Sequence, residues 1–302
     1  MTTTRPRKSA LRRLAPLVLL VLVGVAIPLL LWPWLWGDDD QRTIERERHW
    51  RRAKALLGQT LPGTPDLSAL DERLKAAGLT LGAPVLIRIF KREFELELWL
   101  KRDGRFHRFA QYPICRWSGW LGPKIRQGDK QAPEGFYTVD AGALNPASRW
   151  HRSFNLGFPN AYDRSKGRTG SFLMVHGGCS SVGCYAMTDP VIDEIWRLVV
   201  AALGQGQKRF QVQVFPFRMT EENLAARSTH PSHAFWRALK IGHDLFEAGG
   251  QPPLVGVCRS SYTFASGPRA SDGSAPIAAA CFRPQESAFR AMEKPGTLAV
   301  SR

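Results

Sequence analysis

Cysteine is scarce in this chain, with five residues among 302. That is too few for a disulfide scaffold, and because the number is odd, at least one thiol has no partner within the chain. The unpaired thiol therefore needs a chemical role or a buried site. The hydrophobic fraction of 44% and the charged fraction of 23% exclude a disordered or collagen-like chain. The sequence also lacks an internal repeat, and its length allows one or two domains.

Acidic residues are few relative to basic ones, at 26 against 42, which gives a net charge of +16. Such an excess favours anionic partners such as nucleic acid, phospholipid headgroups or an acidic polymer. Five of the positive charges lie in residues 1–13, where they act as topology signals. Charge alone does not choose among these partners.

An uncharged apolar run covers residues 14–36 and ends in three tryptophans. At about 1.5 Å per residue, a helix of this length spans a hydrocarbon core of roughly 30 Å. The run is longer than the apolar region of a cleaved signal peptide. Basic residues precede it and Asp38–Asp40 follow it, which predicts a cytoplasmic tail at 1–13 and an external remainder. We predict a single-pass signal anchor in the inner (plasma) membrane, with the soluble part facing the periplasm and no nucleic acid as partner.

The soluble part begins with a predicted juxtamembrane helical linker at 37–83, which contains a charged helix over 41–58 and a short helix over 67–77. Apolar alternation from Val85 to Leu100, followed by a turn at 101–105, then predicts an antiparallel meander of three strands.

Four further elements are predicted along the rest of the chain. They are a short strand over 171–176, a helix capped by Thr188 or Asp189 and ending by Gly204, a strand over 210–214, and an amphipathic helix over 235–246. The expected fold is mostly β or α+β, with several antiparallel strands and a packed helix. The catalytic domain would occupy 84–220, and a helical, low-complexity C-terminal extension would occupy 221–302.

The segment Val175–Asp189, with the sequence VHGGCSSVGCYAMTD, concentrates the residues that can perform chemistry. His176 ends a predicted strand, and Cys184 follows across a glycine-rich loop. A thiol with a pKa near 8.5 is only about 3% thiolate at neutral pH, and a histidine within hydrogen-bond reach raises that fraction and carries the proton. Gly183 leaves backbone N–H groups open to a developing oxyanion. The segment therefore favours acyl transfer by a cysteine nucleophile.

Three other interpretations of Cys184 remain open. It could be a buried small hydrophobic residue. It could bind zinc together with His176 and Cys179, although no fourth ligand stands at a familiar spacing and no HExxH motif is present. It could also form a disulfide with Cys179, which would silence the nucleophile. We expect no metal and no organic cofactor, since thiol acyl transfer needs neither.

The same segment resembles the signature of the L,D-transpeptidase family (YkuD-type catalytic domain), which is a His-Gly at a strand end followed by Ser-x-Gly-Cys. His176-Gly177 matches the first element, and Ser181, Gly183 and Cys184 match the second. The resemblance is closest to the YafK-like branch and extends over residues 117–139, 153–171 and 215–220. It covers roughly residues 84–248.

The resemblance implies an L,D-transpeptidase-like β-sandwich domain with Cys184 as nucleophile, His176 as proton donor and acceptor, and Ser181 supporting the motif. The thiolate would attack the L-centred third residue of a peptidoglycan stem peptide and pass the acyl group to an amine. This activity implies roles in cell wall biogenesis and cell shape, either by crosslinking or by attachment of a wall protein. The alternative is an L,D-amidase that passes the acyl group to water and releases wall-bound protein. A third possibility is a non-enzymatic wall-binding module with a structural Cys184.

The sequence departs from the commoner family pattern at two positions. Val182 stands where many members have histidine, and Ala186 stands where many have the arginine that recognises a carboxylate. Arg164, Lys166 or Arg168 in a neighbouring basic loop would have to replace that arginine. The full set of substrate-binding candidates is Gly177, Tyr162, Asn160, Arg164, Arg168 and Trp117.

Overall fold

The structure is a computed structural model that describes residues 39–268 and 271–282. Residues 1–49 and residues 50–302 form two separate compact units. In the first unit the described residues belong to helix α2 (Asp39–Leu56), which continues into the second unit. No helix within the described ranges is both long and apolar enough to cross a membrane. The anchor predicted at 14–36 lies outside these ranges and stays a prediction.

The second unit is built on a five-stranded mixed sheet in the order β3-β2-β1-β10-β5. Its strands are β1 (Val85–Phe90), β2 (Glu95–Arg102), β3 (Arg105–Pro113), β5 (Gly135–Asp140) and β10 (Arg209–Phe215). The predicted meander of β1, β2 and β3 is confirmed. However, β1 and β10 pair in parallel, an arrangement that the expectation of several antiparallel strands did not include. Both strands are buried almost throughout, as strands covered on both faces are.

A second five-stranded sheet, in the order β4-β9-β8-β7-β6, carries the motif. Its short strands are β4 (Arg116–Trp117), β6 (Leu144–Asn145), β7 (Ser153–Asn155), β8 (Met174–His176) and β9 (Tyr185–Ala186). The strand predicted over 171–176 begins only at Met174. Phe172 has a φ of 56°, a left-handed conformation that a strand cannot contain.

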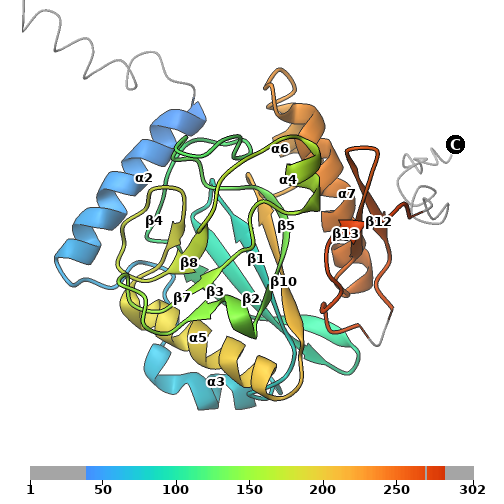
Figure 1. Cartoon of the computed structure of the whole chain (residues 1–302). Helices are drawn as coiled ribbons and strands as arrows, with labels where there is room; N and C mark the ends of the chain where they lie inside the picture. Colours follow the sequence, from blue (N-terminus) through green and yellow to red (C-terminus); the bar gives the residue numbers. More distant parts are fainter. Residues whose placement is uncertain (1–38, 269–270, 283–302) are drawn as a thin grey trace, which may run out of the picture. The chain divides into compact units, whose positions relative to one another are not determined.

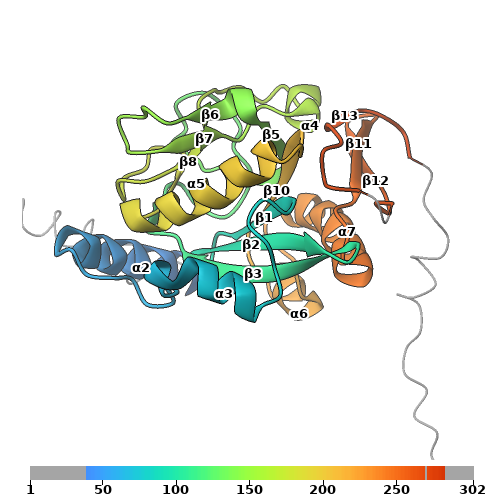
Figure 2. The same cartoon turned by 90° about the horizontal axis from the view of Figure 1, so that it is seen from below.

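The helices of the second unit lie around these sheets (Figure 2). Helix α5 (Asp189–Gly204) confirms the predicted helix, with Pro190 in its first turn and a buried apolar face. The others are α3 (Leu70–Ala76), α4 (Ala161–Ser165), α6 (Glu221–Ala225) and α7 (His233–Gly249), with 3₁₀ turns at Leu67–Ala69 and Ala141–Ala143. The described chain is therefore a mixed α/β structure. It contains more helix than the expected mostly β or α+β domain with one packed helix.

Described residues between Leu224 and Ile277 pack against the central sheet (Figure 1). A third sheet, in the order β12-β11-β13, contains β11 (Leu254–Cys258), β12 (Ser261–Ala265) and β13 (Ala278–Ala279). Phe136 of β5 makes edge-on ring contacts with Tyr262 and Phe264 of β12. Trp236 of α7 lies in the same buried cluster. The segment predicted as a low-complexity extension thus shares a core with the central sheet.

Candidate active site

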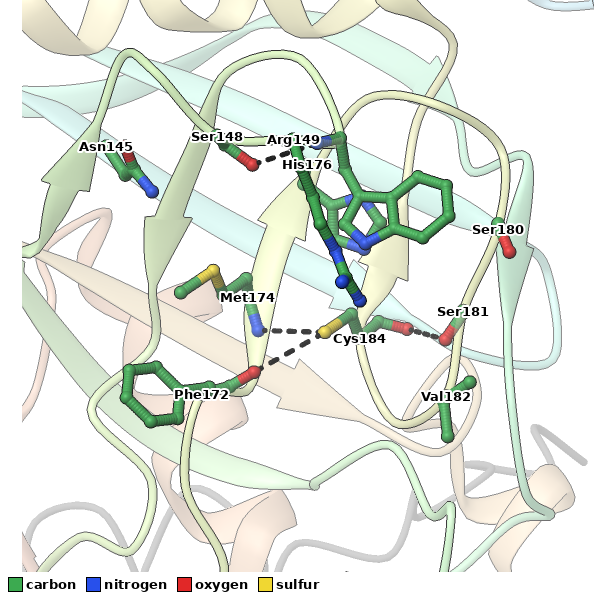
Figure 3. Close-up of a pocket in the computed structure, with 11 residues that line it drawn as sticks. Asn145, Ser148, Arg149, Phe172, Met174, His176, Ser180, Ser181, Val182 and Cys184 are labelled. Carbon is green, nitrogen blue, oxygen red and sulfur yellow. Dashed lines mark hydrogen bonds between the residues drawn. The ribbon is translucent and has the colours of Figure 1, made fainter.

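Parallel pairing of β8 and β9 brings the two motif elements together. Val175 pairs with Tyr185 and His176 with Ala186, so Cys184, immediately before β9, lies beside Met174. The backbone N–H of Met174 is 3.4 Å from Cys184 Sγ. Side chains two residues apart in a strand project from the same face, so His176 lies on the face that Met174 shares with the nucleophile. Figure 3 shows His176 and Cys184 lining one pocket.

The pocket has a volume of about 480 Å³ and is rich in apolar side chains. It is lined by Asn145, Ser148, Arg149, Trp150, Phe172, Met174, His176, Ser180, Ser181, Val182 and Cys184. Within the described ranges, no group of three histidine, cysteine or acidic side chains is placed to hold a metal ion. Three of the predicted site residues, Cys184, His176 and Ser181, are therefore brought together in the pocket.

The tautomer of His176 is fixed by its own neighbour. His176 Nδ1 is 2.5 Å from the carbonyl oxygen of Gly177, and because a carbonyl can only accept, Nδ1 carries the hydrogen. Nε2 is then the basic nitrogen. Burial lowers the pKa of His176, while the Gly177 carbonyl and Asp189 partly oppose that shift. The imidazole is therefore uncharged at neutral pH and able to accept a proton.

The thiol of Cys184 is also uncharged at rest. Burial raises its pKa above the ordinary value, and the N–H of Met174 and the charge of Lys124 only partly oppose the increase. The sulfur is also 3.6 Å from the carbonyl oxygen of Phe172, which can accept the thiol hydrogen. A neutral thiol and a neutral imidazole that line one pocket have the protonation states that general-base activation of a thiol requires.

Two serines hold the turn that presents the nucleophile. Ser181 Oγ donates to the carbonyl of Cys184 at 2.7 Å and is 3.2 Å from Ser118 Oγ. Ser118 in turn accepts the N–H of Gly183 at 2.5 Å. The predicted oxyanion contact at Gly183 therefore requires Ser118 to release this N–H. Ser118 was not among the predicted site residues, although it lies inside the segment 117–139 that carried the resemblance.

The cysteine pairing removes one of the alternatives for Cys184. Disulfides join Cys115 to Cys179 and Cys258 to Cys281, and Cys184 is the free cysteine. The suggested Cys179–Cys184 disulfide was therefore wrong, because Cys179 is bonded to Cys115, the residue before β4. The odd thiol that the cysteine count required is the one in the pocket.

Several predicted binding residues do not line the pocket. Trp117 is fully buried and lies 5.5 Å from the Phe94 ring, centroid to centroid. Gly177 follows His176 in the tight turn, where an added Cβ would lie 2.5 Å from Asp189 Oδ1. Arg164 donates to the carbonyl of Pro159. Each of these residues makes contacts within the fold and does not line the pocket.

The remaining candidates form a buried network around α4. Asn160 caps that helix through the N–H of Asp163, and Arg168 pairs with the same carboxylate at 2.8 Å. Tyr162 stacks on Tyr262 with ring centroids 4.1 Å apart. Polar groups buried in this way are satisfied by each other and are unavailable to a ligand. Sequence reasoning instead missed the loop between β6 and β7, which contributes Ser148, Arg149 and Trp150 to the pocket.

Comparisons with known proteins identify relatives of the chain. The chain is 45% identical over 207 residues to the protein named "Putative L,D-transpeptidase YafK" from Escherichia coli (strain K12), a match covering 68% of this chain and 82% of that protein. The same values hold for its counterpart in Escherichia coli O157:H7. No family model matches the chain.

Among solved structures, the helical cell shape determining protein Pgp2 from Campylobacter jejuni matches with a TM-score of 0.37 and 19% identity. That match covers 53% of this chain and 60% of Pgp2. Bdellovibrio bacteriovorus Bd1075 matches with a TM-score of 0.33 and 16% identity, over 54% of this chain and 60% of Bd1075. The chain therefore spans about three fifths of these solved structures.

Proposed function

The chain belongs to the YafK-like L,D-transpeptidases, and on that premise we propose that it is a cysteine-dependent acyltransferase acting on peptidoglycan stem peptides. The observation that carries the proposal is the free thiol of Cys184 in a pocket with His176. The fixed tautomer of His176 supports it further, because the nitrogen left without a hydrogen can remove the thiol proton.

The proposed reaction has two steps. In the first, His176 Nε2 takes the proton from Cys184 Sγ while the sulfur attacks the carbonyl of the L-centred third residue of the stem. The C–N bond then breaks, and the leaving amine takes the proton from Nε2, which leaves a thioester on the enzyme. In the second step an amine attacks the thioester, loses its proton to Nε2, and releases the thiol as that proton returns to sulfur.

Water can replace the amine in the second step, in which case the products are a free carboxylate and the same thiol. The transferase and the L,D-amidase thus share the acyl-enzyme and differ only in the group that attacks it. We place the amine first because the relative that establishes the family is named as a transpeptidase. Acceptors on a cell wall would be a second stem peptide or a wall-attached protein.

The test uses the full-length chain incubated with purified sacculi that retain their bound proteins. Cys184→Ala serves as the control, and muropeptides and released proteins are identified by mass spectrometry. New links between third-position residues, or a new protein link, are expected with the wild type and not with the variant. Release of wall protein without any new link would assign the amidase. Identical products from both proteins would refute the acyl-enzyme and favour a wall-binding module.

We further propose that residues 14–36 anchor the chain in the inner membrane and that the chain from Gly37 onward faces the periplasm. Two disulfides support an oxidising compartment. The measurement is protease accessibility in spheroplasts, with loss of the catalytic unit expected on addition of protease to intact spheroplasts. Protection of that unit until lysis would refute the proposed orientation.

A further inference from the structure

We propose that Arg149 is the specificity residue of the pocket and binds a carboxylate of the stem peptide next to the scissile bond. This inference rests on the proposed function for the identity of the ligand. Two carboxylates are candidates, namely the terminal carboxylate of the leaving residue and the side-chain carboxylate of the third residue. Both would present the same chemistry to a guanidinium, which matches a carboxylate with two parallel N–H donors.

The first observation that supports the proposal is the distribution of charge in the pocket. Arg149 is the one lining residue with a permanent positive charge, and no lining residue is acidic. Figure 3 shows its side chain extending from the β6–β7 loop toward Cys184. The neighbouring side chains include Phe172, Met174 and Val182, so none of these three competes with the guanidinium for an anion.

The second observation that supports the proposal is that the Arg149 guanidinium has no acidic partner among the described residues. Among the described residues, no salt bridge and no side-chain hydrogen bond engages the Arg149 guanidinium, whose recorded contact is the face of Trp150 at 5.3 Å. Arg149 is an exposed residue, and guanidinium donors without a protein partner stay available to an anionic ligand. By contrast, Arg168 is already bound to Asp163 and Lys124 to Asp129.

The loop that carries Arg149 is fixed in place. The Trp150 ring lies 6.2 Å from the His176 ring and fills the space beside Gly178, where an added Cβ would approach Trp150 Cε3 to 3.1 Å. On the other side, His151 Nε2 is 2.7 Å from Asp193 on α5. Because the loop is held by the general base and by a helix, the guanidinium is positioned at low entropic cost.

The first experiment measures an anion site without relying on turnover. Alkylation of Cys184 is compared with iodoacetate and with iodoacetamide, which form the same thioether bond and expel the same iodide but differ in charge. Arg149→Gln should lower the iodoacetate-to-iodoacetamide rate ratio about tenfold, the effect of one charge-assisted contact. Arg149→Lys should recover part of the ratio. Arg237→Gln, an exposed change on α7 with the same charge loss, should leave the ratio unchanged.

The second experiment uses stem tetrapeptides with free carboxylates, with the terminal carboxylate amidated, or with the side-chain carboxylate amidated. Arg149→Gln should raise KM about tenfold or more for the free peptide, the effect of losing a charged hydrogen bond. Arg149→Gln should not raise KM for the peptide in which the carboxylate that Arg149 binds is already amidated. The peptide that shows no increase therefore identifies which of the two carboxylates Arg149 binds.

An unchanged probe ratio in Arg149→Gln would overturn the anion site whatever the activity. If the wild type turns over none of the peptides, the proposed function fails, and the probe ratio alone then decides the anion site. If KM rises equally for all three peptides, Arg149 has only a structural role and the proposal is refuted.

Discussion

Removal of the disulfide between Cys115 and Cys179 is expected to affect both stability and the active site. The bridge closes a separation of 64 residues, for which loop-closure entropy predicts a loss of about 4 kcal/mol. The bridge between Cys258 and Cys281 closes 23 residues and by the same relation contributes about 3 kcal/mol. At about 2–4 °C per kcal/mol for a unit of this size, either loss lowers Tm by about 10 °C.

The two bridges differ in what lies beside them. Cys179 belongs to the loop between His176 and Cys184, and its N–H donates to the carbonyl of Met187 at 3.2 Å. The N–H of Cys115 donates to the carbonyl of Ala186 at 2.8 Å. This bridge therefore joins two segments that are each hydrogen-bonded to the residues just after Cys184. The second bridge joins the end of β11 to a residue beyond β13, and neither of its cysteines lines the pocket.

The double variants Cys115→Ala/Cys179→Ala and Cys258→Ala/Cys281→Ala make a matched pair. Thermal unfolding followed by circular dichroism should give similar decreases in Tm. Alkylation of Cys184 by iodoacetamide, measured well below both transitions, should change only in the first variant. Equal alkylation rates in both variants would refute the reasoning that this bridge positions the nucleophile.

Four further predictions concern individual residues. Because burial raises the pKa of Cys184 above 9.0 and lowers that of His176 below 6.5, alkylation of the thiol should continue to accelerate above pH 9. A plateau beginning near pH 6 would instead indicate a thiolate–imidazolium pair. The same shifts favour the uncharged forms in the folded state, so urea unfolding should show stability falling as pH drops below 6.5 and again as it rises above 9.0. Lys91→Met should lower the free energy of unfolding by about 3–5 kcal/mol, because it leaves the buried carboxylate of Glu134 without its cation. Adding Glu134→Gln should recover part of that loss in urea denaturation, and a further loss would contradict the pairing. Gly183→Ala should cost about 1–3 kcal/mol and slow alkylation of Cys184, because φ at this position is 114° and a Cβ would lie 3.0 Å from Leu173 Cδ1. Unchanged alkylation would show that the turn tolerates a side chain.

Local patterns in the sequence were sufficient to predict several strands and the helix that follows the motif. Alternation predicted β1 and β2, because a strand's side-chain period is visible in neighbouring residues. The Asp-Pro start and the helical spacing predicted α5. The motif residues His176 and Cys184 could be identified because their chemistry is local to one short loop. The parallel pairing of β1 with β10 could not be predicted, since the two strands are more than 100 residues apart. No local pattern in the sequence indicates which strands become neighbours.

The basic candidates show why a binding residue is hard to select from sequence. Arg164 and Arg168 were chosen because they stand in a basic loop, yet Asp163 stands in the same loop and occupies Arg168. Arg149 was overlooked, although the nearest acidic residue along the chain is Asp140, nine positions away. A cation with no acid within a helical turn or a strand pair cannot be neutralised locally. It therefore must be paired by tertiary contacts, exposed to solvent, or kept for a ligand. Arg149 lines the pocket without a partner, which excludes the first of these within the described structure. The residue is exposed, and the charged and neutral alkylating probes test whether its guanidinium also binds a ligand.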